Sequence, residues 1–166
     1  MIIYLLRHGQ AEPKADSPDK TDVSRRITQE GARQVRKVSE LAKKLGARPD
    51  IFVSSPFIRA KQSAEIAREV LNPSAELRID NSLEPESEPP RVYEYLSSLE
   101  KDFGSPLLVT HIPLLGKLVS DLLGCSLNIV TESSSLLRID SKTHLISPSS
   151  GTLVWLLPQL SDAISV

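Results

Sequence analysis

The chain begins with an unbroken apolar segment. Residues 2–6 read Ile-Ile-Tyr-Leu-Leu, and a run that is apolar at every position is typical of a strand covered on both faces of a parallel sheet. Similar short runs recur at 51–53 and 107–110, with a weaker one at 77–79. Between these runs the apolar positions recur every three or four residues. The pattern therefore predicts buried strands that alternate with amphipathic helices.

Four stretches have helical periodicity. The first follows Thr28, a good N-cap residue, and stops at Gly46, a residue common at helix ends. The second is expected to start at Ser55 and Pro56, which suit the N-cap and the first helical position, and to extend to about Leu71. A proline-rich stretch at 84–90 is expected to be a loop. The inward positions are predicted for three of the helices: in the first, Ala32, Val35, Val38, Leu41, Ala42 and Leu45; in the third, Val92, Tyr95, Leu96 and Leu99; and in the fourth, Leu114, Leu115, Leu118, Val119 and Leu122.

Two further apolar runs, 136–139 and 152–157, are expected to form closing strands joined by a hairpin-like connection. Strands that alternate with helices build a mostly parallel sheet, to which the last pair adds one antiparallel member. We therefore expect an α/β fold, a three-layer sandwich in which helices cover both faces of a mostly parallel central sheet. The 166 residues, 40% of them apolar, suffice for one core. Without an internal repeat or a linker, a single domain spanning 1–166 is predicted.

Charge and cysteine content narrow the class further. The chain has 20 Lys and Arg against 21 Asp and Glu, without the basic excess that nucleic-acid binding requires, so nucleic acid is not an expected partner. No run approaches the roughly 18 apolar residues of a membrane span, and no basic segment precedes the first apolar run, so we expect a soluble, cytoplasmic protein with no membrane contact. The single cysteine, Cys125, fits a reducing compartment and is expected to be a small buried residue.

Three short segments place basic or imidazole side chains where a predicted strand ends or a helix begins. Arg7 and His8 follow the first strand, Arg59 follows the second, and His111 follows the strand at 107–110. In open α/β sheets, ligands bind outside the carboxyl ends of the strands. We therefore expect these four side chains to meet in one pocket.

The expected pocket has a clear chemical preference. Guanidinium groups suit a tetrahedral dianion such as phosphate, and a bound anion would offset the cost of placing Arg59 near a positive helix start. A neutral imidazole is a competent nucleophile, and nearby cations both lower its pKa and neutralise the transferred oxygens. His8 is the better nucleophile candidate, and Gly9 would allow a sharp turn and close approach of a phosphoryl group. His111 could alternatively only cap its helix.

The triplet Arg7-His8-Gly9 at the end of the first strand resembles the signature of the histidine phosphatase superfamily, whose fold is phosphoglycerate mutase-like. Both the order and the spacing of the motifs are similar to those of the compact SixA-type phosphohistidine phosphatases. Two further segments carry the resemblance: Ser-Pro-Phe-Ile-Arg-Ala-Lys-Gln-Ser at 55–63 is similar to the family's Ser-Pro-x-x-Arg-Ala-x-Gln-Thr, and His-Ile-Pro at 111–113 is similar to its second-histidine motif.

The resemblance implies that His8 becomes phosphorylated, while Arg7, Arg59 and His111 bind the transferred group. It implies no metal and no other cofactor. The residues agree, because no Asp or Glu accompanies the histidines in ligand-like spacing.

The proton donor and the substrate stay open at this stage. Many members of the superfamily use a carboxylic acid from the region of Glu84 and Glu86, although these residues could equally be a solvated acidic loop. An imidazole leaves more readily than an alkoxide, so a missing acid would favour phosphohistidine as substrate. About fifty residues separate Arg59 from His111, which leaves little material for a lid. We expect an open site for a phosphorylated protein, such as a phosphotransfer domain. The alternatives are a small phosphomonoester and a phospho-binding module without catalysis.

Overall fold

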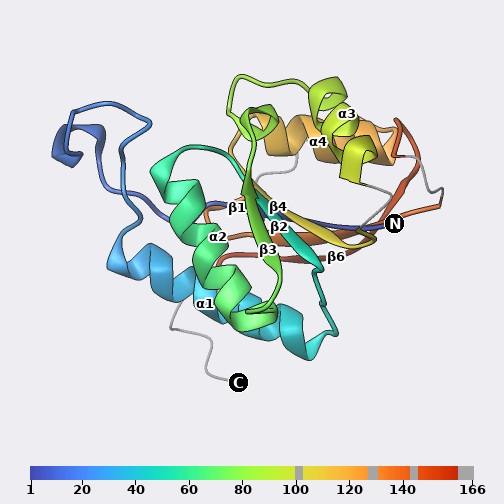
Figure 1. Cartoon of the computed structure of the whole chain (residues 1–166), viewed down its shortest axis with the longest axis horizontal. Helices are drawn as coiled ribbons and strands as arrows, with labels where there is room; N and C mark the ends of the chain where they lie inside the picture. Colours follow the sequence, from blue (N-terminus) through green and yellow to red (C-terminus); the bar gives the residue numbers. More distant parts are fainter. Residues whose placement is uncertain (100–102, 127–130, 143–145, 161–166) are drawn as a thin grey trace.

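The structure, a computed structural model, describes residues 1–99, 103–126, 131–142 and 146–160 (Figure 1). None of the helices in these ranges combines the length and the hydrophobicity that a membrane span needs. The strands are β1 (Ile2–Arg7), β2 (Ile51–Ser54), β3 (Glu76–Ile79), β4 (Pro106–Thr110), β5 (Leu136–Ser141) and β6 (Gly151–Leu157). The α-helices are α1 (Gln29–Lys44), α2 (Ile58–Leu71), α3 (Pro89–Leu99) and α4 (Leu114–Leu123), and two short 3₁₀ helices span Lys14–Asp16 and Asn81–Leu83.

The strands form a single mixed sheet in the order β3-β2-β4-β1-β5-β6. β1 and β2 both pair parallel with β4, and β3 pairs parallel with β2. β5 pairs antiparallel with both β1 and β6, so it is the one reversed strand of the sheet. Figure 1 shows α1 and α2 on one face of the sheet and α3 and α4 on the other. The predicted fold class is therefore confirmed.

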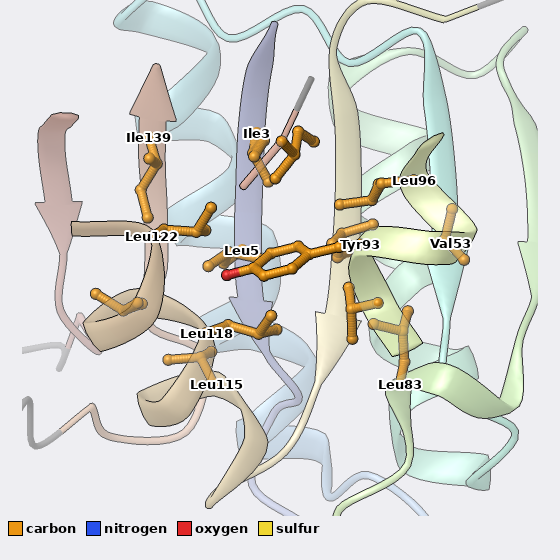
Figure 2. Packing of buried hydrophobic residues seen from close by; sticks show 14 of the residues in the cluster. Ile3, Leu5, Val53, Leu83, Tyr93, Leu96, Leu115, Leu118, Leu122 and Ile139 are labelled. Atoms are coloured by element: carbon orange, nitrogen blue, oxygen red, sulfur yellow. The ribbon is translucent and has the colours of Figure 1, made fainter. Parts of the chain in front are cut away.

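The hydrophobic core has two halves, one on each face of the sheet. Successive strand side chains point to opposite faces, so Ile3 and Leu5 of β1 pack beneath α3 and α4, whereas Tyr4 and Leu6 pack against α1 and α2. Figure 2 shows the first half, where Leu118 of α4 and neighbouring side chains lie over β1. Both faces are covered, which agrees with the apolar run of residues 2–6.

Helix α2 begins at Ile58, two residues later than its sequence predicts. Ser55 does not act as an N-cap: its N–H donates to the Val109 carbonyl at 3.1 Å, which extends the sheet hydrogen bonding by one residue. The cap position falls on Phe57, whose side chain makes no capping hydrogen bond. The expectation that Ser55 and Pro56 start this helix is therefore wrong.

Three other local expectations need correction. Helix α3 already begins at Pro89, inside the stretch expected to be a loop, because proline suits a first helical turn. Tyr95 was predicted to point inward but is only partly buried. The tyrosine of α3 that packs into the core is Tyr93, whose hydroxyl donates to Asp121 Oδ2 at 2.7 Å. Cys125, expected to be buried, is exposed just after the left-handed Gly124 that ends α4.

Candidate active site

A cavity of about 480 Å³ lies where β1 and β4 end and α2 begins. β1 and β4 lie side by side with Arg7 paired to Thr110, so the residues that follow these strands become neighbours. The N–H of His8 donates to the Thr110 carbonyl at 3.1 Å, and the His8 and His111 ring centroids are 4.9 Å apart. Arg59, the second residue of α2, completes the set. The structure thus brings Arg7, His8, Arg59 and His111 to the wall of one cavity.

The hydrogen bonds of His8 define its tautomer. Its Nδ1 lies 2.7 Å from the Gly9 carbonyl, which can only accept, so Nδ1 carries the proton. Its Nε2 therefore keeps a lone pair, and this atom accepts a hydrogen bond from Arg59 Nε at 3.1 Å. The whole side chain is buried. The free nitrogen of a neutral imidazole thus faces a guanidinium group.

The surroundings keep both histidines neutral. Burial, followed by the charges of the neighbouring arginines, lowers the pKa of His8 to about 4, although its hydrogen bond to the Gly9 carbonyl acts in the opposite direction. His111 lies with Nε2 2.8 Å from Ser55 Oγ. Burial, then repulsion from His8 and Arg59, lowers the pKa of His111 to about 2. At neutral pH His8 is therefore in the form that can attack phosphorus.

This neutrality can be measured by NMR. We expect the ring signals of His8 and His111, assigned with His8→Gln and His111→Gln variants, to show no protonation between pH 7 and pH 5. The pKa of His8 is lower in the folded protein than in the unfolded chain, so between about pH 6.5 and about pH 4 the unfolded chain binds more protons than the folded protein. The free energy of unfolding therefore decreases as the pH falls through this range. The His8→Gln variant should lose part of this pH dependence in thermal melts. A His8 midpoint near pH 6.5 would contradict the burial argument.

Arg59 is held from three sides. Besides its hydrogen bond to His8, its Nη1 donates to the Asp22 carbonyl and its Nη2 donates to Asp22 Oδ2 at 2.8 Å. Its guanidinium carbon lies 4.9 Å from the centre of the Phe57 ring. Arg7 donates through Nη1 to the Thr131 carbonyl, and burial lowers the pKa of this arginine.

The structure adds two charged residues that the sequence reasoning missed. Asp22 and Arg25, from the polar segment between β1 and α1, also line the cavity. Arg25 Nη1 donates to Asp22 Oδ1 at 2.8 Å. A cation near the start of a helix is unfavourable, and the sequence alone suggests that a bound anion offsets this cost. In the structure, the Asp22 carboxylate already supplies a negative charge beside Arg59. The position of Arg59 near a helix start indicates that an acidic partner is needed, but it does not indicate which acidic residue that is.

Two small residues beside the site, Ser63 and Gly9, have structural roles. Ser63 Oγ accepts from the Gly9 N–H at 2.9 Å and donates to the Arg59 carbonyl at 2.6 Å, so it connects the chain after β1 to α2. Gly9 itself is needed for packing: a Cβ there would lie 2.5 Å from Ile27 Cδ1 and 2.9 Å from the Gly31 carbonyl oxygen. The structural reason for this glycine is thus close packing against Ile27 and the first turn of α1, because its φ is not positive.

The structure distinguishes the two candidate acids. Glu86 is exposed and lies at the rim of the cavity with Pro85 and Ile112, whereas Glu84 is not among the residues that line it. Within the described ranges, no three His, Cys, Asp or Glu side chains gather closely enough to hold a metal ion.

Comparison with known proteins agrees with this geometry. Residues 3–84 match the sequence profile of the histidine phosphatase superfamily (branch 1). The chain belongs to this superfamily, and it is a phosphatase. It is similar to the phosphohistidine phosphatase SixA of Escherichia coli (strain K12), with 30% identity over 123 residues that cover 74% of each chain.

Solved structures extend the similarity to the whole fold. The protein histidine phosphatase SixA complexed with tungstate superposes with a TM-score of 0.82 at 25% identity, covering 96% of this chain and 97% of that one. A mycobacterial glucosyl-3-phosphoglycerate phosphatase superposes with a TM-score of 0.71 at 18% identity, covering 93% and 98%. The second similarity shows a shared fold only.

Proposed function

We propose that the protein removes the phosphoryl group from phosphohistidine on a protein partner, through a covalent phosphohistidine on His8. The observation that carries this proposal is the neutral Nε2 of His8, buried beside Arg59 in a cavity that Arg7 also lines. A lone pair in a cationic cavity suits attack on a phosphoryl group, because the cations neutralise the charge on its oxygens. The similarity to SixA of Escherichia coli supports phosphohistidine as the substrate.

In the first step, the hydrogen bond from Arg59 Nε to His8 Nε2 opens, and Nε2 forms a bond to phosphorus while the bond from phosphorus to the donor nitrogen breaks. A donor ring that is protonated on its other nitrogen leaves as neutral imidazole, so this step needs no proton from the enzyme. Phosphorylated His8 carries a positive ring charge, which the Gly9 carbonyl stabilises through the hydrogen bond to Nδ1. Arg7 and Arg59 hold the phosphoryl oxygens throughout the transfer.

In the second step, water attacks phosphorus from the side opposite His8, and the bond between phosphorus and Nε2 breaks. The proton lost by the water leaves with the phosphate product or passes to solvent. His8 returns to its neutral form with the proton still on Nδ1. The tungstate bound by the similar SixA structure supports an oxyanion site of this kind, since tungstate is tetrahedral like phosphate. Nδ1 of His111 has no hydrogen-bond partner among the described residues, and a bound oxyanion would provide one.

Substrate profiling tests the proposal. We expect kcat/KM for a protein phosphorylated on histidine to exceed that for sugar phosphates by about two orders of magnitude, because the alkoxide leaving group of a sugar phosphate needs a proton that imidazole does not. The histidine-phosphorylated protein can be prepared with phosphoramidate. Higher kcat/KM on sugar phosphates would overturn the assignment of substrate.

One observation favours a second candidate, hydrolysis of a small phosphomonoester: Glu86 lies at the cavity rim, where a carboxylic acid could protonate a leaving oxygen. Under the main proposal, Glu86→Gln should change phosphohistidine turnover by less than about threefold. Under the second candidate, it should lower sugar-phosphate turnover by about 10²-fold or more. Glu84→Gln is the matched control, because it removes the same charge two residues away, outside the cavity lining. A large loss confined to Glu86→Gln and to phosphomonoesters would decide for the second candidate.

A further inference from the structure

A carboxylate stands inside the proposed phosphate cavity. Asp22 presents one oxygen to Arg59 and the other to Arg25, each at 2.8 Å, and its carbonyl also accepts from Arg59. A negative charge at this place repels a phosphoryl dianion, so it does not serve anion binding directly. Burial raises the pKa of Asp22, but the hydrogen bonds and charges of Arg25 and Arg59 outweigh this and hold the pKa below its usual value. The carboxylate is therefore ionised when substrate arrives.

The contacts of Asp22 determine where the Arg59 guanidinium lies. All three nitrogens of this group are engaged, Nε with His8 and the two Nη atoms with Asp22, and the side chain is only 5% exposed. A guanidinium with its terminal nitrogens held on one side cannot turn without losing both bonds. Asp22 thus keeps Nε directed at Nε2 of His8.

The segment that carries Asp22 is itself anchored to α2. The Val23 carbonyl accepts from the Ile58 N–H at 3.1 Å, and Gln62 Oε1 accepts from the Ile27 N–H at 2.9 Å. Arg25 is tied back to the same segment, since its Nε donates to the Glu12 carbonyl at 2.7 Å. Figure 1 shows this segment projecting from the body of the molecule between β1 and α1. Besides His8, four of its residues line the cavity: Gln10, Ala11, Asp22 and Arg25.

We propose that Asp22 is a positioning residue, which holds Arg59 against His8 and orients Arg25 as a third cation at the same cavity. This inference rests on the proposed function of His8. The two guanidinium groups are then in place before the phosphoryl group enters, and only the hydrogen bond from Arg59 Nε to His8 Nε2 has to open when that nitrogen attacks phosphorus. The benefit of Asp22 lies in the transition state, while its charge slightly opposes the binding of phosphate in the ground state.

The variant Asp22→Asn tests whether Asp22 acts on the transition state and not on the binding of phosphate. Asparagine keeps the shape but has one acceptor oxygen, so it cannot hold both arginines. We expect kcat to fall about 10- to 100-fold, while the inhibition constant for inorganic phosphate stays within about threefold of the unmodified enzyme or becomes smaller. Asp22→Glu, which restores the charge, should recover part of kcat. Asp19→Asn is the matched control, because Asp19 bonds Thr21 and Ser24 in the same segment but does not line the cavity.

Each other result overturns the inference. Unchanged kcat in Asp22→Asn would exclude a positioning role, and phosphate binding weakened in proportion to kcat would make Asp22 a binding residue. An equal loss in Asp19→Asn would mean that the segment is needed only for folding. Single-turnover labelling separates this test from that of the proposed function: in Asp22→Asn the label should still form on the protein, but more slowly. Label that does not depend on His8 would refute the proposed function, whatever the effect at Asp22.

Discussion

Replacement of His8 with alanine should abolish formation of a covalent phosphoenzyme and lower turnover by at least ~10³-fold. The reason is that Nε2 of His8 is the lone pair that faces Arg59 within the cavity. Under the proposed mechanism, this variant keeps the arginines that would bind the phosphoryl group but lacks the atom that would accept it. The measurement is rapid quench with a labelled phosphoramidate donor, followed by assay of acid-labile label on the polypeptide.

Two variants complete this experiment. His8→Gln fills most of the same volume and keeps an acceptor for Arg59, so it separates loss of chemistry from loss of packing. His111→Gln keeps the nucleophile, so label should still form, although at a reduced rate. Acid-labile label of undiminished intensity on the His8→Ala protein would refute the role assigned to His8.

The second large effect is expected at Arg59. Arg59→Ala should lower kcat/KM by about 10²- to 10³-fold. The reason is that the variant lacks a positioned hydrogen-bond donor that would stabilise the negative charge on the phosphoryl oxygens in the transition state. It also leaves the Asp22 carboxylate without its buried partner. Arg59→Lys keeps the charge but not the planar fork, so it should recover only a small part of the loss. Initial rates and phosphate inhibition constants measure both effects.

Arg26→Ala is the matched control for Arg59. Arg26 is an exposed arginine of the segment between β1 and α1 and does not line the cavity, so removing it changes the net charge equally and should alter kcat/KM by less than about twofold. Unlike Asp22→Asn, Arg59→Ala should also weaken the binding of inorganic phosphate. Undiminished phosphate affinity in Arg59→Ala would contradict its proposed contact with the phosphoryl group.

Among local features, the sequence was informative where burial alone decides the outcome. The continuous apolar run of β1 predicted a central strand, and the strand is covered on both faces. Thr28 predicted the start of α1, and its side chain accepts from the Gly31 N–H as a cap should. These predictions succeeded because the side chain's own chemistry and its immediate neighbours determine the result.

The sequence was less informative where a polar group can choose between partners. Ser55 has the chemistry of a helix cap, yet its hydroxyl lies against His111 and its N–H continues the hydrogen bonding of the sheet. Asp22 looked like one of many acids in a polar loop, because nothing within a few residues of it reveals an arginine 37 positions away in the chain. Partners at such a distance are set by how the strands and helices pack.

The sequence by itself determined the alternation of strands and helices, the class of the sheet, and the nomination of Arg7, His8, Arg59 and His111 as candidate site residues, because periodicity and residue chemistry are properties of short segments. Only the tertiary structure decided which nitrogen of His8 is free, which acid holds Arg59, and which glutamate reaches the cavity. The physical reason is that hydrogen bonds are short and directional. A shift of one helix start by two residues, as in α2, is enough to redirect them.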